Sequence, residues 1–386
     1  MFRYLLIVLL QLELLRGSNV SNELADEELV LSFVVSRHGE RAPDSDELAL
    51  SDQQEKLRKL TYIEGLEGLT NAGKRRAYQI GKFIRQRYGH EGYGLLPKIY
   101  MPSEVEIRST DKDRTKMTAQ IAMAAVFPPE PEEQWDEGLG RVWQPVPYTA
   151  IPLSEDYLRY YANCQKFKDL MAIAKKKAVL EEFHQFQDMV SLILKETGKD
   201  FSEDPLQFQT IFDLFKSTVS LGLDIPEWAK PLLPELGEAA RLAYRLYYKT
   251  DEMKKIGGGV LLNDFIEAAK KISSGEPMKK RFRMFSGHDF NIGSLMEVTK
   301  VIRHEQSNPE YGALFALELY KSKRTGEYSV VPIYLPRAGA SSVQVLHFSF
   351  CENTPHCSLE KFIENTKEFV LPEKDFYNIC TIKTEL

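Results

Sequence analysis

The chain has 386 residues, 43% of them hydrophobic and 27% charged, which is typical of a globular protein with one large domain or two unequal ones. Its formal net charge of −6 provides no general positive field, which argues against nucleic acid and anionic membranes as partners. An anionic ligand would therefore have to be held by a local cluster of cations.

The first residues are typical of a signal peptide. Arg3 precedes an apolar run, residues 4–15, that is interrupted by Gln11 and Glu13, and Ser18 follows near the expected cleavage point. The run is too short to span a bilayer, and no later segment is long enough. We therefore expect residues 1–18 to be removed and the mature protein, without a membrane span, to enter the secretory pathway. A buried N-terminal helix is the alternative interpretation.

The segment after this leader predicts a buried strand followed by charged residues. Residues 29–35 form a continuous, partly β-branched apolar run of the kind found in strands that are buried on both faces. The run leads into Arg37 and His38, with Arg41 close behind. Apolar residues then recur at helical spacing up to Gly89, a natural helix stop, which predicts an amphipathic helix.

The same order of strand, polar residues and helix recurs further along the chain. Residues 104–107 alternate charged and apolar side chains like a short strand, and they lead to Arg108 before a second helix that ends at Pro128. Residues 145–255 are rich in Leu, Lys, Glu and Ala, which favours a mainly helical insertion. We interpret residues 136–256 as a cap domain.

A third short strand is expected at residues 282–285, and it leads to His288 and Asp289 ahead of another helix. Upstream, the glycine run 257–259 precedes a helical segment. We interpret this run as a hinge or a tight helix start, because a phosphate-binding loop would need a strand immediately before it. Residues 313–335 predict a late antiparallel hairpin.

Three expected strands thus end in residues that suit an enzyme acting on an anion, and the carboxyl ends of strands in open α/β sheets converge on one site. The planar guanidinium group of an arginine can donate hydrogen bonds to two phosphate oxygens at once. A neutral imidazole is a competent nucleophile, and nearby cations lower its pKa so that it stays unprotonated in acid, which suits His38. Asp289 could protonate the departing alkoxide, although an Asp ahead of a helix can also be a simple N-cap.

Three motifs resemble those of the histidine acid phosphatases. Residues 37–43, Arg-His-Gly-Glu-Arg-Ala-Pro, resemble the RHGxRxP signature of that family. Residues 107–110, followed by Asp113 and Arg114, are similar to its second arginine motif, and residues 286–289 are similar to its HD motif. The similarity covers essentially all of the chain after the leader. An HD rather than an HAE third motif points to the acid phosphatase branch.

This resemblance implies a fold, an activity and a set of site residues. The fold is α/β, a mixed, mainly parallel sheet flanked by helices, with residues 25–135 and 257–386 in the catalytic domain and a smaller helical cap. The activity is hydrolysis of small-molecule phosphate monoesters through a covalent phosphohistidine, without a metal ion or cofactor. His38 is then the nucleophile, Asp289 is the proton donor, and the phosphate is bound by Arg37, Arg41, Arg108 and His288.

Four cysteines follow the leader, and an even number in an exported protein favours two disulfides over free thiols. Their positions alone allow three connectivities. Animal relatives commonly carry six cysteines, and the resemblance implies that one whole pair is absent here, with Leu314 at one of its positions. It pairs Cys164 with Cys380 and Cys351 with Cys357.

The final destination and the oligomeric state are less evident. We expect secretion, with the ER lumen or the lysosome as alternatives, because residues 383–386, Lys-Thr-Glu-Leu, resemble a KDEL-type retrieval signal with one substitution. Asn19 begins the one N-glycosylation sequon. The sequence leaves the oligomeric state open, a homodimer included.

Two other functions compete with hydrolysis. A secreted ligand-binding protein on an inactive acid phosphatase scaffold would normally have lost the nucleophile or an arginine, whereas all of these positions are intact here. A phosphoglycerate mutase is disfavoured because the leader and the disulfides place the chain outside the cytosol. Release of phosphate from an aryl phosphate at pH 5 separates the enzyme from the binding protein.

Overall fold

The computed structural model describes residues 26–302, 308–340, 342–351 and 354–380. The expected leader, the sequon at Asn19 and the residues that resemble a retrieval signal, 383–386, lie outside the described residues.

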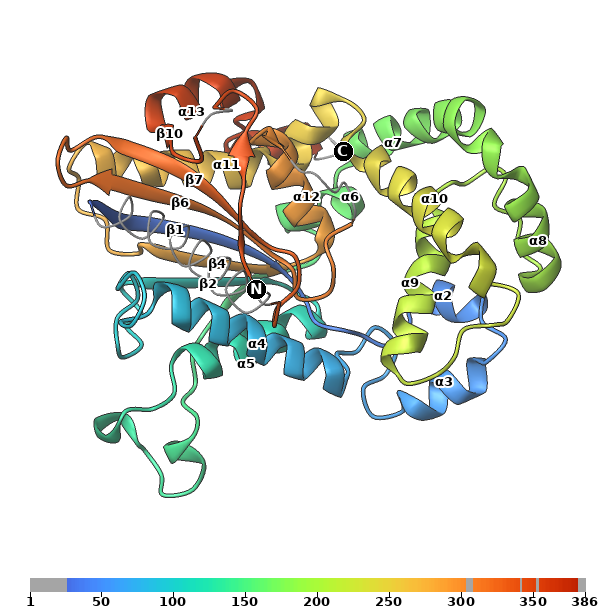
Figure 1. Ribbon diagram of the computed structural model, residues 1–386, viewed down its shortest axis with the longest axis horizontal. Coiled ribbons are helices and arrows are strands. Elements are labelled where there is room, and N and C mark those ends of the chain that lie inside the picture. Colours follow the sequence, from blue (N-terminus) through green and yellow to red (C-terminus); the bar gives the residue numbers. More distant parts are fainter. Residues whose placement is uncertain (1–25, 303–307, 341, 352–353, 381–386) are drawn as a thin grey trace, which may run out of the picture.

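An eight-stranded sheet forms the centre of the molecule (Figure 1). Strands β1, β4, β2 and β3 run parallel to one another in that order, and β6, β7, β8 and β10 extend the sheet beyond β1 in antiparallel fashion. A mixed α/β sheet is thereby confirmed. The strands are β1 (Glu27–Arg37), β2 (Val105–Thr110), β3 (Thr149–Ile151), β4 (Phe282–Gly287), β6 (Leu314–Ser322), β7 (Tyr328–Leu335), β8 (Gln344–Val345) and β10 (Cys357–Ser358). A separate pair joins β5 (Val301–Ile302) to β9 (His347–Phe348).

Helices cover both faces of this sheet. Helices α4 (Asn71–Tyr88) and α5 (Asp113–Val126) lie on one face, and α11 (Asp251–Ser273), α12 (Asp289–Val298) and α13 (Leu359–Thr366) lie on the other (Figure 1). Successive residues of a strand point to opposite faces. Accordingly, Val34 belongs to the core under α4 and α5, whereas Phe33 and Val35 belong to the core under α11 and α12. Burial on both faces explains why the apolar run in β1 is continuous.

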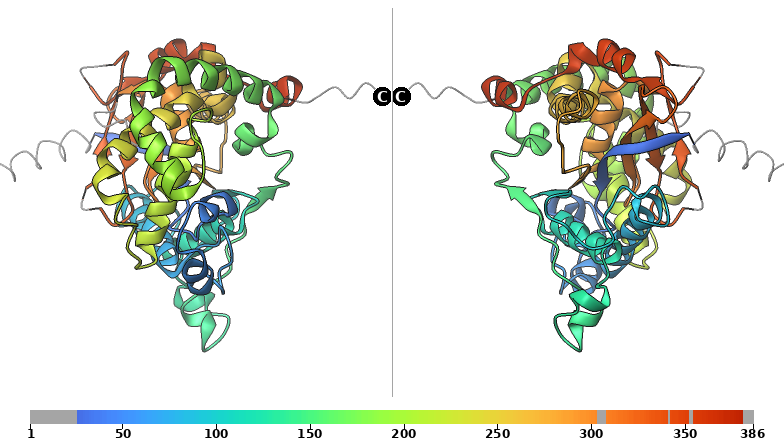
Figure 2. Two further views of the ribbon diagram at one scale, coloured as in Figure 1. Left: turned by 90° about the vertical axis from the view of Figure 1, so that its right-hand side faces the viewer. Right: turned by 90° about the vertical axis from the view of Figure 1, so that its left-hand side faces the viewer.

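A mainly helical region lies beside the sheet, as Figures 1 and 2 show. It is joined by two short helices from the segment that follows β1, and α2 contacts α9. No described helix combines the length and the apolar character needed to cross a bilayer. The helices are α2 (Ser45–Ala49), α3 (Gln54–Leu60), α6 (Tyr160–Asn163), α7 (Gln165–Ala178), α8 (Gln187–Thr197), α9 (Gln207–Ser220) and α10 (Leu233–Arg245), with α14 (Glu373–Cys380) at the end of the described chain.

Two disulfides connect parts of this architecture. Cys164 is bonded to Cys380, which ties α14 to the start of α7, and Cys351 is bonded to Cys357 across a short loop. Both predicted pairs are confirmed.

The interpretation of the glycine run as a hinge or helix start is wrong. Helix α11 begins at Asp251, where the Thr250 side chain accepts a hydrogen bond from the Met253 N–H, so residues 257–259 lie well inside the helix. A Cβ atom at Gly258 would lie 2.5 Å from the Ser294 carbonyl oxygen of α12. The glycines therefore serve close packing of α11 against its neighbours, a tertiary requirement that outweighs their low helix propensity.

Candidate active site

The carboxyl ends of β1 and β4 lie side by side and position two histidines. Arg37 is in register with Gly287, and the His38 N–H donates to the Gly287 carbonyl oxygen over 3.1 Å. The His38 and His288 rings are therefore neighbours, with centroids 5.6 Å apart. They face a cleft of about 400 Å³ between the sheet and the helical region. Of the predicted site residues, Arg37, His38, Arg41, His288 and Asp289 line it.

The His38 ring is held in one tautomer. Its Nδ1 lies 2.7 Å from the Gly39 carbonyl oxygen, which can only accept, so Nδ1 carries the proton. Its Nε2 then has a free lone pair, which accepts a hydrogen bond from Nε of Arg114 over 3.1 Å. The geometry presents an unprotonated ring nitrogen to the cleft.

Burial and neighbouring charges keep this nitrogen unprotonated. Burial lowers the pKa of His38 well below its usual value, and the positive charges of Arg114 and Arg37, together with nearby His288, lower it further. The backbone beside it is tightly packed, because a Cβ atom at Gly39 would lie 2.3 Å from the Gly73 carbonyl oxygen at the start of α4. His38 is thus a rigidly placed, neutral imidazole.

Two arginines of the cleft are held in fixed orientations. Arg41 makes a bidentate pair with Glu47, over 2.7 and 2.5 Å. Arg37 is 3% exposed, lies over the Tyr311 ring and donates from Nη1 to the Pro309 carbonyl oxygen over 2.6 Å. Such fixed guanidinium groups suit a phosphate dianion without reorganisation when the ligand binds.

Arg108 does not line the cleft, contrary to expectation. Strand β2 continues to Thr110, so Arg108 lies within the strand and not beyond its end. There its guanidinium is held by the buried carboxylate of Asp156, 2.6 Å away, and is covered by the Tyr157 ring. The pleat and the extra strand residues account for the difference, because they turn Arg108 toward the segment after β3.

Arg114 lines the cleft instead. It lies in the first turn of α5, and besides its bond to His38 it pairs with Glu67 over 2.7 Å. Arg114 was not among the site residues predicted from the sequence, although it belongs to the same motif. The sequence feature that could have identified it is its position in the first turn of the helix that follows β2, beyond the end of the strand that contains Arg108.

The Asp289 carboxyl faces Arg37 and a second carboxylate. Its Oδ2 lies 3.4 Å from Nη2 of Arg37, and Oδ2 of Asp213 lies 3.8 Å from the same nitrogen. Burial raises the pKa of Asp289 above its usual value; Arg37 opposes this rise, and the negative charge of Asp213 adds to it. Asp289 is therefore suited to hold a proton in mild acid.

His288 lies between these groups and the far wall of the cleft. Its Nε2 lies 3.1 Å from Oγ1 of Thr110 at the end of β2. Burial lowers its pKa well below the usual value, and Arg114 and Arg159 contribute in the same direction. The ring is thus a neutral hydrogen-bonding group.

Several cleft residues carried no signal in the sequence. Asp213 comes from α9, and an aromatic wall is formed by Tyr161, Tyr247 and Phe290, with the last two stacked at 4.1 Å. Arg159 also lines this wall. All but Phe290 lie in the helical region, where sequence spacing gives no indication of which side chains meet the sheet.

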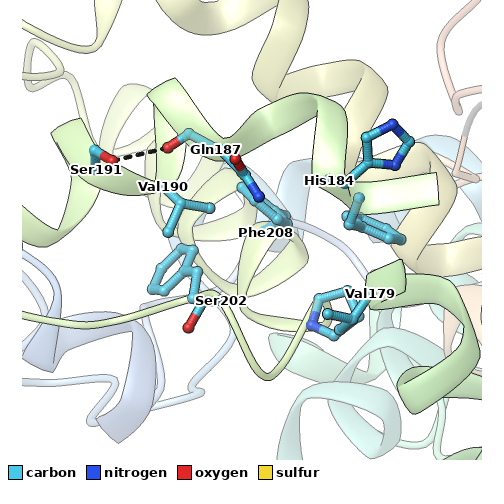
Figure 3. Close-up of a pocket in the computed structure, with 10 residues that line it drawn as sticks. Val179, His184, Gln187, Val190, Ser191, Ser202 and Phe208 are labelled. Carbon is cyan, nitrogen blue, oxygen red and sulfur yellow. Dashed lines mark hydrogen bonds between the residues drawn. The ribbon is translucent and has the colours of Figure 1, made fainter. Parts of the chain in front are cut away.

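A separate hollow of about 290 Å³ lies within the helical region (Figure 3). It is framed by α8 and the π-helical turn Val179–Phe183, and Ser191 donates to the Gln187 carbonyl oxygen at its edge. Among the described residues that line it, His184 is the one ionisable group. This hollow therefore lacks the charged groups that phosphate chemistry requires.

Comparison with known proteins identifies relatives over most of the chain. The sequence profile of the histidine phosphatase superfamily (branch 2) matches residues 28–334. The chain is 31% identical to the venom acid phosphatase Acph-1 of Apis mellifera, an alignment that covers 90% of this chain and 87% of that protein. It is 30% identical to the prostatic acid phosphatase of Homo sapiens, over 88% of this chain and 84% of the relative.

Solved structures agree on the fold. The apo form of a Hafnia alvei phytase superposes with a TM-score of 0.66 at 17% identity, over 90% of this chain and 98% of the phytase. The phytase from Citrobacter braakii superposes with a TM-score of 0.65 at 16% identity, over 90% and 99% of the two chains.

Proposed function

The chain belongs to the histidine phosphatase superfamily, branch 2, and we propose that His38 and Asp289 carry out its hydrolysis of phosphate monoesters in acid. The observation that carries this assignment is the orientation of His38. Its free Nε2 points into a cleft lined by arginines, and the buried carboxyl of Asp289 lies in the same cleft. A nucleophile, an anion site and a proton donor thus share one space.

In the first step the phosphoryl group moves to the histidine. Arg37, Arg41 and Arg114 bind the oxygens of the phosphate, which replaces His38 as the hydrogen-bond acceptor of Arg114, and His288 donates to the same group. Nε2 attacks phosphorus, so that an N–P bond forms while the P–O bond to the leaving group breaks. Asp289 gives its proton to the departing oxygen, and the product is an alcohol or a phenol.

In the second step water releases the phosphate. Asp289, now a carboxylate, accepts a proton from the water that attacks phosphorus, and the N–P bond breaks to regenerate neutral His38. The arginines hold the developing charge in both steps. No group besides water is consumed.

Residues 136–256, apart from strand β3 of the central sheet, are proposed to act as a cap over the reacting groups, with residues 25–135 and 257–386 as the catalytic part. The support is that α9 supplies Asp213 and that Tyr161 and Tyr247 form a wall of the cleft. Exclusion of water by such a cap strengthens the electrostatic interactions with phosphate. Helix α11 continues from the cap into the catalytic part.

A purely ligand-binding role, the alternative from sequence, is not favoured. The buried and desolvated acid Asp289 has no use in holding an anion, since a carboxyl group near a phosphate opposes binding when it ionises. Release of inorganic phosphate from phenyl phosphate at pH 5, with and without EDTA, is the direct test. A purified chain that binds the ester without releasing phosphate would remove the enzymatic assignment.

We also propose the secretory pathway as the location, with secretion as the end point. The venom and lysosomal acid phosphatases among its relatives and the two disulfides support this compartment. The alternative is retrieval to the ER through residues 383–386, which predicts that removal of these residues increases secretion into the medium. Equal secretion with and without them would remove the retrieval role.

A homodimer is proposed through the edge of the sheet at β3. This strand ends the parallel half of the sheet, and its residues Thr149 and Ala150 are exposed. An open sheet edge is a template for pairing with a second copy. Ala150→Lys should shift sedimentation toward the monomer, and a monomeric wild-type protein would refute the dimer.

A further inference from the structure

Arg159 stands on the cleft wall without a partner among the described residues. The other cleft arginines, Arg37, Arg41 and Arg114, each pair with a carboxylate. In Arg159, by contrast, Nε and Nη1 are buried and have no hydrogen-bond partner within the described chain. Buried donors left unsatisfied are costly, and a guanidinium in this state is suited to receive an anion.

The position of Arg159 is fixed by the backbone around it. It ends the 3₁₀ turn Tyr157–Arg159, which begins where Asp156 accepts from the Leu158 N–H over 2.9 Å. The Leu158 carbonyl oxygen in turn accepts from Nδ2 of Asn291, in the first turn of α12, over 2.8 Å. The turn that carries Arg159 is therefore anchored to the helix that begins with Asp289.

Aromatic contacts connect Arg159 with the surroundings of His288 and Asp289. Its guanidinium carbon lies 5.4 Å from the centre of the Tyr161 ring. That ring lies 6.4 Å from His288 and 5.1 Å from Phe290, the residue after the proposed proton donor. A leaving group protonated by Asp289 would extend along Tyr161 and Phe290 toward Arg159.

We infer that Arg159 forms a second anion subsite, which selects phosphate monoesters whose leaving group is flat or apolar and carries a further negative charge, such as a carboxylate. This inference rests on the proposed function. The aromatic wall packs the body of the leaving group, and the Arg159 guanidinium binds its anionic end. The transferred phosphate is bound by the other three arginines.

Two matched substrates test this subsite: phenyl phosphate and 4-carboxyphenyl phosphate. For the Arg159→Gln variant, we expect kcat/KM on the carboxylated ester to fall by about ten- to a hundredfold, the size of a charged hydrogen-bond contribution. Activity on phenyl phosphate should stay within about twofold. The loss should appear mainly in KM, because the contact is present in the ground state and the transition state alike. Arg159→Lys should restore part of it.

The controls separate the possible outcomes. Arg58→Gln removes an exposed arginine of α3 away from the cleft and should leave both substrates unchanged. An equal loss on both substrates would overturn the inference, since Arg159 would then act on the transferred phosphate or on the fold, and thermal unfolding distinguishes these two. No loss on either would also overturn it. If the wild-type enzyme hydrolyses neither ester, the proposed function itself fails.

Discussion

Nε of Arg114 donates a hydrogen bond to Nε2 of His38 over 3.1 Å, while Nδ1 of the same ring faces the Gly39 carbonyl oxygen. One ring nitrogen is therefore fixed as the proton carrier, and the other is left as the nucleophile. Arg114, which donates a hydrogen bond to this nucleophilic nitrogen, is also placed to bind a phosphate group beside it.

The first prediction concerns the nucleophile. His38→Ala should lower turnover by at least about a thousandfold with the fold intact, because no other described side chain can take its place at that position. Rapid quench of the wild type should trap a phosphoprotein that is labile in acid and stable in base. His184→Ala, in the separate hollow of the helical region, is the matched control and should retain full activity. Substantial activity in His38→Ala would refute the covalent route.

The second prediction separates Arg114 from Arg108. Arg114→Gln should lower kcat/KM on all phosphate monoesters by about 10² to 10³, as expected for loss of a donor to the transition state. Arg108→Gln should mainly destabilise the fold, by about 3 to 5 kcal/mol, because it leaves the buried carboxylate of Asp156 unpaired. Kinetics and denaturant unfolding of both variants measure this. The reverse pattern would return the phosphate-binding role to Arg108.

The third prediction concerns the proton donor. Asp289→Ala should slow glycerol phosphate hydrolysis by about 10² to 10⁴, because a poor leaving group needs the proton, whereas nitrophenyl phosphate should lose far less. Wild-type activity on the alkyl ester should fall as pH rises through the raised pKa of Asp289, and the variant should lack that fall. Equal losses on both esters would mean that Asp289 acts only through structure or binding.

The fourth prediction concerns Asp213, whose negative charge raises the pKa of Asp289. Asp213→Asn removes that charge without changing the shape, so the pKa of Asp289 should fall. Because Asp289 must be protonated to act, the alkaline limb of the pH–rate profile should move to lower pH. Arg37 and Lys216, which lower the pKa of Asp289, remain in place in this variant, so they favour the same downward shift. An unchanged or upward-moved limb would exclude this electrostatic coupling.

The fifth prediction concerns the disulfides. Alkylation of the unreduced protein should modify no cysteine by intact mass, and modification of all four would contradict the pairing. Replacing Cys164 and Cys380 by serine should cost more stability than replacing Cys351 and Cys357. The reason is that Cys164 and Cys380 are separated by 216 residues and close a much longer loop of the unfolded chain.

Sequence patterns sufficed where the physical cause is local or repeated along the chain. The uninterrupted apolar run in β1 required burial on both faces, and Phe33 and Val34 indeed belong to opposite cores. The hairpin of β6 and β7 was likewise predicted from two successive strand-like segments, residues 313–320 and 328–335, and it is confirmed. The disulfide pairs followed from the family resemblance, since the positions alone allowed other connectivities.

Other features depended on contacts between distant segments. The glycine run 257–259 suggested a break in the helix, but its small residues are required where α11 packs on α12. Asp213 carried no sequence signal because it joins the site only when α9 packs beside the ends of β1 and β4.

The sequence by itself determined the class of fold, the RHG and HD motifs and the presence of a histidine among arginines. The tertiary structure alone decided which arginine reaches that histidine. Residues Arg108 and Arg114 lie in one motif, and only the length of β2, which ends at Thr110, turns Arg108 toward Asp156 and leaves Arg114 at the cleft. The extent of a strand is set by pairing with its neighbours in the sheet, so no local pattern of side chains could have settled it.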